Sequence, residues 1–109
     1  MTGFRPRFEI WWSQRARRDV REIGDFIARD KPEAAMRWAS RIMDTVGRLE
    51  MFPSSGRSVP EIGRDDLREI ILEGYRIVYQ IRGEAVIVLT VFEGRMRLDK
   101  QAVDDNASE

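Results

Sequence analysis

The feature that most limits the fold of this 109-residue chain is a pair of apolar stripes with helical spacing. Apolar residues recur every three or four positions within residues 14–29 and again within 33–51, so each segment predicts an amphipathic helix. Ser13 stands where its hydroxyl can cap the first helix, and Pro53 ends the second. The connection Asp30-Lys31-Pro32 is so short that the two helices must lie side by side as an antiparallel hairpin.

Segments with strand patterns flank this hairpin. Residues 8–12 alternate before it, and three further strands are predicted within 67–92, after a loop rich in Pro, Gly and Ser at 53–66. Gly83-Glu84 suits a type II′ turn, and the nearly all-apolar segment 85–92 predicts a central strand that is covered on both faces. The expected fold is α+β, in the order strand, helix, helix, strand, strand, strand, with the helical hairpin packed on a small antiparallel sheet.

The length and the pattern predict one domain over residues 1–98. Residues 99–109 are polar and show no stripe, so we expect a frayed C-terminal tail. No apolar run approaches the ~20 residues that span a membrane, and no signal peptide is evident, so the expected location is the cytoplasm.

The absence of cysteine and histidine limits the chemistry further. It excludes disulfides, Cys/His zinc sites and any Ser-His or Cys-His nucleophile pair. We therefore expect no metal and no cofactor. Any catalysis would depend on Arg, Lys, Tyr, Asp or Glu.

The cations are almost all arginine, although the formal net charge is zero. Only Lys31 and Lys100 are lysines among the 19 cationic residues. Arginine forms bidentate contacts with phosphate and carboxylate, which indicates an anionic partner. A GC-rich genome would give the same composition on an ordinary surface, and composition alone leaves both interpretations open.

Four segments, spread over residues 8–97 and in the right order, resemble the RelE/ParE superfamily of bacterial toxins, nearer to its ParE branch. The first, residues 13–23, is similar to the first helix of ParE-type toxins. The second, residues 52–61, reads FPSSGRSVPE and resembles their loop. The third combines Leu67-Arg68-Glu69 with GYRIVY at 74–79, and the fourth is VFEGR at 91–95.

The resemblance implies a small cytoplasmic toxin produced together with a ParD-like antitoxin, which neutralises it in a heterotetramer or larger complex. ParE members poison DNA gyrase and block replication, whereas RelE members cleave messenger RNA on the ribosome. The RNA-cleaving relatives that lack histidine use basic residues on the sheet and a tyrosine near the C-terminus.

That nuclease set is incomplete here. Arg76 and Arg95 stand at matching strand positions, but the segment 67–72 offers no lysine and no tyrosine follows Arg95. Guanidinium groups stabilise a phosphate but do not readily exchange protons near neutral pH. We therefore expect a gyrase-binding toxin with no catalytic residues. The alternatives are a RelE-type mRNA endonuclease and a diverged, non-toxic module that binds an antitoxin.

The residues expected to contact the target are Arg57, Arg76, Arg95 and Arg97. Arg57 has two interpretations, an anion contact or an ion pair with Glu61. Arg76 is expected on the polar side of its strand, so replacing Arg76 or Arg95 with alanine should reduce toxicity with little change in melting temperature.

Two further residues, Trp11 and Arg68, are candidates for antitoxin binding. Trp11 points away from Ile10 and Trp12 along the first strand. It is either an exposed aromatic side chain or covered by neighbouring elements, and the sequence leaves both open.

Overall fold

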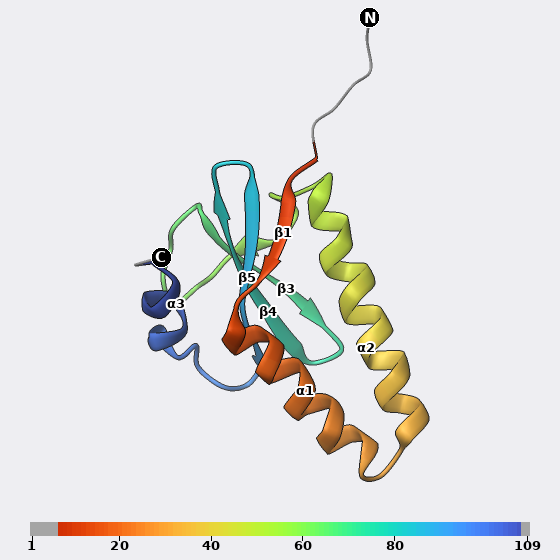
Figure 1. Ribbon diagram of the computed structural model, residues 1–109. Helices are drawn as coiled ribbons and strands as arrows, with labels where there is room; N and C mark the ends of the chain where they lie inside the picture. The colour runs from red at the N-terminus through yellow and green to blue at the C-terminus, as the bar shows by residue number, and fades with distance from the viewer. Residues whose placement is uncertain (1–6, 108–109) are drawn as a thin grey trace, which may run out of the picture.

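The computed structural model describes residues 7–107 (Figure 1). Its elements are β1 (Glu9–Trp12), α1 (Gln14–Ala28), α2 (Pro32–Gly47), the short 3-10 helix η1 (Arg48–Glu50), β2 (Arg57–Ser58), β3 (Leu67–Leu72), β4 (Tyr75–Arg82), β5 (Ala85–Glu93) and α3 (Lys100–Ala107).

Both predicted helices are present, and their starts follow from the sequence. The Ser13 hydroxyl accepts a hydrogen bond from the Ala16 backbone N–H at 2.9 Å, as an N-cap should. The same hydroxyl donates to the Leu89 carbonyl at 2.9 Å, which ties the start of α1 to β5. Pro32 begins α2, where its missing N–H leaves no bond unmade. The second helix ends at Gly47 rather than at residue 51, because the chain tightens there into η1.

The expected α+β fold is confirmed, but the sheet is mixed rather than antiparallel. The strand order is β1-β5-β4-β3-β2, and β1 pairs with β5 in parallel while the other neighbours are antiparallel. The helical hairpin that follows β1 supplies the long connection that a parallel neighbour requires. The two-residue strand β2 lies within the segment predicted as a loop. Gly83 has a φ of 58°, in keeping with the predicted glycine-first turn between β4 and β5.

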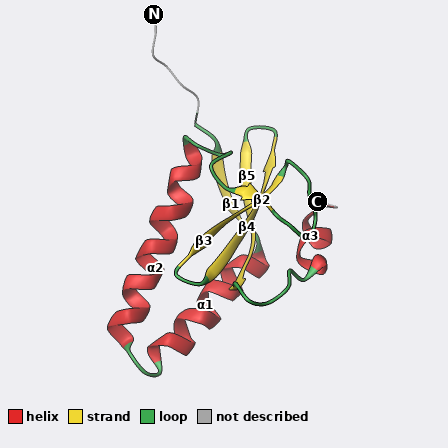
Figure 2. Cartoon of the chain, turned by 180° about the vertical axis from the view of Figure 1, so that it is seen from behind, coloured by secondary structure: helices red, strands yellow, loops and turns green. Residues whose placement is uncertain are grey.

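The sheet is covered on both faces. Figures 1 and 2 show α1 and α2 on one face and α3 on the other. On the first face, Trp38 and Ile42 of α2 pack with Tyr79 and Val88 of the sheet. On the second face, Val59 of the 53–66 loop packs with residues of β3, β4 and β5 and with α3. The side chains in the middle of β4 are accordingly buried on both faces, with Ile77, Val78 and Tyr79 at 0% exposure.

The C-terminal segment that we expect to be frayed contains a helix in its described part. Residues 100–107 form α3, and its Ala102 and Val103 are buried. Together with buried Leu98 they form a stripe of only three apolar residues, too short to be recognised by periodicity. No helix within residues 7–107 is long and apolar enough to cross a membrane.

Candidate functional site

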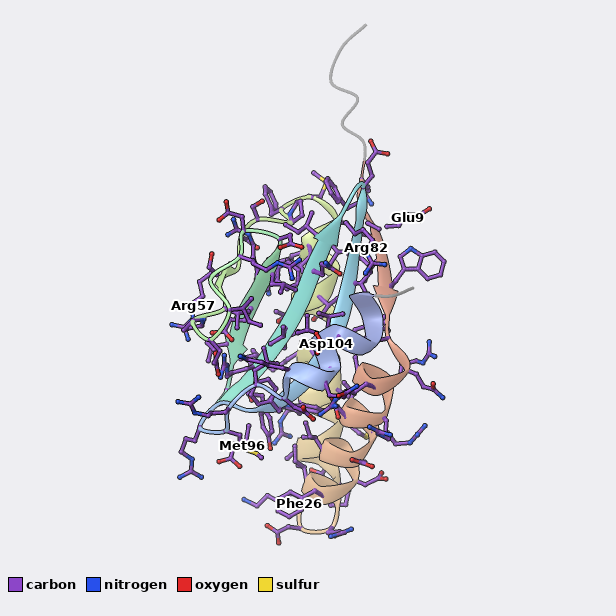
Figure 3. All side chains as sticks on the ribbon, turned by 90° about the vertical axis from the view of Figure 1, so that its left-hand side faces the viewer. Glu9, Phe26, Arg57, Arg82, Met96 and Asp104 are labelled. Atoms are coloured by element: carbon purple, nitrogen blue, oxygen red, sulfur yellow. The ribbon has the colours of Figure 1, made fainter. Side chains whose placement is uncertain are left out.

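The four arginines expected to contact a target line one shallow depression of about 580 Å³. It lies where β3 turns into β4 and where the chain leaves β5, beside the loop that precedes β3. Figure 3 shows Arg57 on the loop side of this surface. Its lining is Arg57, Pro60, Glu61, Ile71, Gly74, Arg76, Gly94, Arg95 and Arg97, and we call it the arginine surface.

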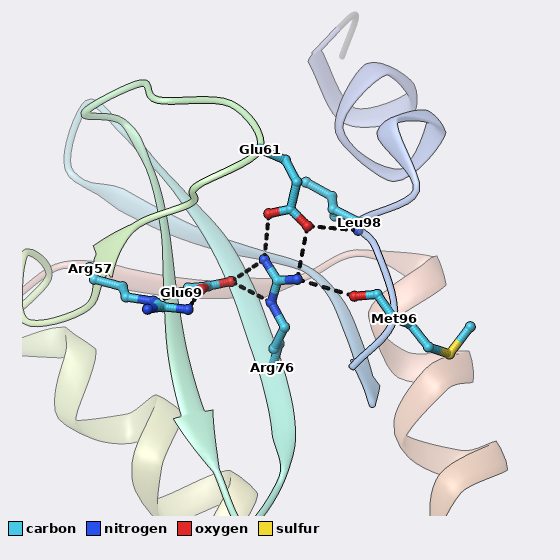
Figure 4. A network of polar contacts seen from close by, with 6 residues as sticks. All are labelled: Arg57, Glu61, Glu69, Arg76, Met96 and Leu98. Carbon is cyan, nitrogen blue, oxygen red and sulfur yellow. Dashed lines mark hydrogen bonds and ion pairs between the residues drawn. The ribbon is translucent and has the colours of Figure 1, made fainter. Parts of the chain in front are cut away.

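Arg76 lies beneath this surface and is almost entirely buried. Its Nε donates to Glu69 at 2.7 Å, and its Nη1 and Nη2 donate to the two carboxylate oxygens of Glu61 at 2.9 and 2.7 Å (Figure 4). Nη1 also donates to the Met96 carbonyl at 3.2 Å, and the guanidinium lies 4.9 Å from the centre of the Phe92 ring. One side chain thus ties together β3, the 53–66 loop and the segment after β5.

The burial of Arg76 corrects the expectation that it is exposed on the polar side of β4. Strand alternation does place it opposite Tyr75 and Ile77, but that second face is covered as well. Because its donors are engaged by two carboxylates, Arg76 positions neighbouring segments and presents little of itself to a partner. Its replacement should therefore destabilise the fold, contrary to the expectation of an unchanged melting temperature.

Sequence reasoning missed Glu69 altogether and assigned Glu61 to Arg57 rather than to Arg76. Glu69 is 1% exposed, and Glu61 also accepts a hydrogen bond from the Leu98 backbone N–H at 3.1 Å. The hydrogen bonds from Arg76 lower the pKa of Glu61 from 4.5 to about 2, and those to Glu61 raise the pKa of Arg76. For Glu69 a signal existed: alternation puts it on the same face as the apolar Leu67, which favours burial.

Arg57 forms an ion pair, but with Glu69 rather than with Glu61. Its Nε and Nη2 both lie 2.7 Å from Glu69 Oε2, while its side chain stays 62% exposed. The interpretation of Arg57 as a member of an ion pair is therefore right, but its partner is Glu69 and not Glu61. Since most of the guanidinium faces solvent, Arg57 can still contact an external anion.

Arg95 and Arg97 are the exposed cations of the surface. Arg95 donates to Glu93 through Nε at 2.8 Å, yet its side chain is 91% exposed, so this pair is weak. Arg97 is exposed and forms no ion pair with the side chains of residues 7–104. Both can form bidentate contacts with carboxylate or phosphate at little cost to the fold.

The two residues expected to bind an antitoxin lie apart from each other. Trp11 is on β1, at one edge of the sheet, and is 58% exposed, which decides between the two interpretations that the sequence left open. Arg68 is on β3 and donates to the carbonyls of Gly56 at 2.8 Å and Asp65 at 3.0 Å. Through these bonds Arg68 holds the 53–66 loop in place. The geometry of Arg68 gives no support to a role in antitoxin binding.

The arginine surface is suited to binding anions rather than to moving protons. The described residues that line it include no tyrosine and no lysine, and Glu61 is held as a carboxylate by Arg76. A carboxyl with a pKa of about 2 is a poor general acid or base near neutral pH, because it rarely carries the proton. Among the described residues, no three metal-binding side chains of the His, Cys, Asp or Glu type cluster together.

Comparison with known proteins identifies the family. The profile of the ParE toxin of the type II toxin–antitoxin system parDE matches residues 10–98. Protein Y4kP of Sinorhizobium fredii, whose name marks it as a candidate toxin, is 38% identical over 94 residues, covering 84% of this chain and 93% of Y4kP. Toxin ParE3 of Caulobacter vibrioides is 34% identical over 62 residues, covering 57% of this chain and 61% of ParE3.

Solved structures show the same fold at lower identity. The chromosomal ParDE system of P. aeruginosa superposes with a TM-score of 0.67 at 20% identity, covering 79% of this chain and 95% of that one. A double arginine-to-alanine variant of the E. coli toxin RelE, in the free state, gives 0.62 at 16% identity, covering 94% and 96%. Family profile, relatives and fold agree, and this chain belongs to the ParE toxin family of type II toxin–antitoxin systems, within the RelE/ParE superfamily.

Proposed function

We propose that this toxin acts by binding, with its arginine surface contacting DNA gyrase and blocking replication in the cytoplasm. The observation that carries the proposal is the state of Arg76. A phosphate-cleaving site needs a cation free to stabilise the charge that develops on the phosphate, and here the central arginine is already engaged by Glu61 and Glu69. The remaining cations, at positions 57, 95 and 97, favour recognition of an acidic protein surface.

The toxin is then neutralised by a cognate, ParD-like antitoxin in a heterotetramer or larger complex. The family match supports this, as does likeness of fold to the RelBE2 toxin–antitoxin complex of Mycobacterium tuberculosis, with a TM-score of 0.56. Exposed Trp11 at the β1 edge remains a candidate contact for it.

A RelE-type nuclease is the competing function, favoured by likeness of fold to RelE itself. In that case the two exposed arginines after β5 would stabilise the phosphate, and proton transfer would have to come from a group outside the described lining. A diverged, non-toxic module that binds an antitoxin is the third alternative.

Induced expression without the antitoxin separates these functions. We expect incorporation of labelled thymidine to stop before incorporation of labelled methionine. A variant with Arg95→Ala and Arg97→Ala should lose most of this effect. A matched variant with Arg18→Ala and Arg21→Ala, on the exposed face of α1, should keep it. Protein synthesis stopping first would favour the nuclease, and normal growth would favour the non-toxic module.

A further inference from the structure

The exposed side of α2 carries a stripe of its own, besides the one that enters the core. Successive residues of an α-helix are turned by about 100°, so positions three and four apart share a side. One set of exposed residues follows this spacing along α2 and onto its C-cap. We call this set the outer stripe of α2, and its members are Glu33, Met36, Arg37, Ser40, Met43, Asp44, Gly47 and Arg48.

The outer stripe is divided lengthwise by the kind of side chain. At about 100° per residue, Met36 and Met43 lie along one flank, Ser40 and Gly47 lie along the middle, and the charged residues lie along the other flank. Met36 is 74% exposed and Met43 is 56% exposed. Two large, flexible apolar side chains exposed in a row are typical of a surface that contacts another molecule.

The other members of the stripe are not explained by contacts within the chain either. The charged members form no ion pair with the side chains of residues 7–104, and they are Glu33, Arg37, Asp44 and Arg48. A Cβ added at Gly47 would meet nothing within 4 Å, although glycine weakens a helix at this position. The stripe therefore has charges to offer and a gap in its middle.

The outer stripe is complementary to itself. Three pairs are each centred on Ser40 to within one residue, and they are Met36 with Met43, Arg37 with Asp44, and Glu33 with Arg48. A two-fold axis beside Ser40 and perpendicular to α2 sets a second copy of the helix antiparallel to the first. Each member of a pair then meets the other member on the second copy, and the reverse contact forms as well. The same axis keeps each flank opposite the identical flank, so methionine meets methionine and each cation meets an acid.

We propose that the outer stripe of α2 is the surface through which two copies of this toxin associate, as an antiparallel pair of α2 helices. An unrelated partner would not require charges and methionines that are centred on one residue, so this symmetry favours a second copy. The small residues in the middle let the two helices approach closely. Gly47 faces the first turn of the other helix, and the hollow of about 590 Å³ beside Gly47, lined also by Met43 and Phe52, has room for that turn.

The association goes beyond the proposed function and does not depend on it. The arginine surface shares no residue with the outer stripe, so both copies keep it free for a target. One face of a helix is smaller than the roughly 800 Å² per partner of a standard interface, and we therefore expect a weak dimer with a dissociation constant in the micromolar range.

Sedimentation velocity of the purified full chain, from about 1 µM to about 1 mM, tests the proposal. The wild-type mass should rise from 12.8 kDa towards twice that value. Arg37→Asp and Asp44→Arg should each weaken the association at least about tenfold, because like charges then face each other at two places. An equimolar mixture of these two variants should associate again, since every cation in the mixed dimer meets an acid. Asp25→Arg, on the exposed side of α1, should change the association less than about twofold.

A wild-type chain that stays monomeric at every concentration would overturn the proposal. A wild-type dimer that persists in both charge variants would overturn it too, because the interface would then lie elsewhere. The same holds for a mixture of the two variants that stays monomeric while each variant melts like the wild type. Variants that lose binding to the antitoxin, from a toxin that never dimerises, would assign the stripe to the antitoxin instead.

Discussion

Replacing Arg76 with alanine should destabilise this protein far more than replacing any other arginine of the surface. The substitution removes a side chain that is 7% exposed and leaves Glu61 without its cation and Glu69 with only Arg57. Removing one member of a buried ion pair costs about 3–5 kcal/mol, because the other charge stays desolvated and unpaired. For a domain of this size that corresponds to a fall in melting temperature of roughly 15 °C or more.

Thermal unfolding followed by circular dichroism measures this effect, with Arg95→Ala as the matched control. The Arg95 side chain is 91% exposed, so its loss should change the free energy of unfolding by no more than about 0.5 kcal/mol. If Arg76→Ala melted within a few degrees of the wild type, as Arg95→Ala should, the network around Arg76 would not have the structural role described here.

Three further predictions concern stability. Protonation of Glu61 should lower the free energy of unfolding by roughly 3 kcal/mol as the pH drops from about 4.5 to about 2, because the folded-state pKa of Glu61 lies below its unfolded value. This stabilisation is complete only above the unfolded value, so urea titrations at several pH values should show a shallower loss in Glu61→Gln than in the wild type. Gly56→Ala should destabilise the protein by about 1–3 kcal/mol, because the new Cβ would lie 2.7 Å from the Glu69 carbonyl oxygen and from the Tyr79 hydroxyl. Gly24→Ala is the control: a Cβ there meets nothing within 4 Å, so this variant should stabilise α1 by up to about 1 kcal/mol. Equal effects of the two variants in urea titrations would contradict this packing. Val88→Asp should not fold, since a carboxylate would be buried without a partner in the middle of β5, and a soluble, cooperatively melting variant would argue against that placement.

Local patterns were sufficient to predict most of the elements. The helical stripes, the Ser13 cap and the glycine-first turn at Gly83 each depend on residues close in sequence, and the structure has all three. The parallel pairing of β1 with β5 could not be read in this way, because it joins segments that are more than 70 residues apart.

The sequence was enough to select arginines that lie together, but not to predict their contacts. Arg57, Arg76 and Arg95 stand in the family-like segments and Arg97 follows the last of these, and the fold does bring all four to one surface. Whether each arginine is exposed depends on which segments cover the second face of the sheet. These segments are the irregular 53–66 loop and α3, whose apolar stripe is too short to be recognised in the sequence. The carboxylate of Glu61 reaches Arg76 from 15 residues away, at a position where strand alternation gives no information.

Binding of DNA gyrase is the central claim, and a supercoiling assay with purified components tests it most directly. The wild-type toxin should inhibit the reaction and trap gyrase on DNA. The variant with Arg95→Ala and Arg97→Ala, folded and equally stable, should need at least about tenfold more protein for the same inhibition. Undisturbed supercoiling, together with ribosome-dependent cuts in messenger RNA that this variant fails to make, would contradict the claim and assign the surface to a nuclease.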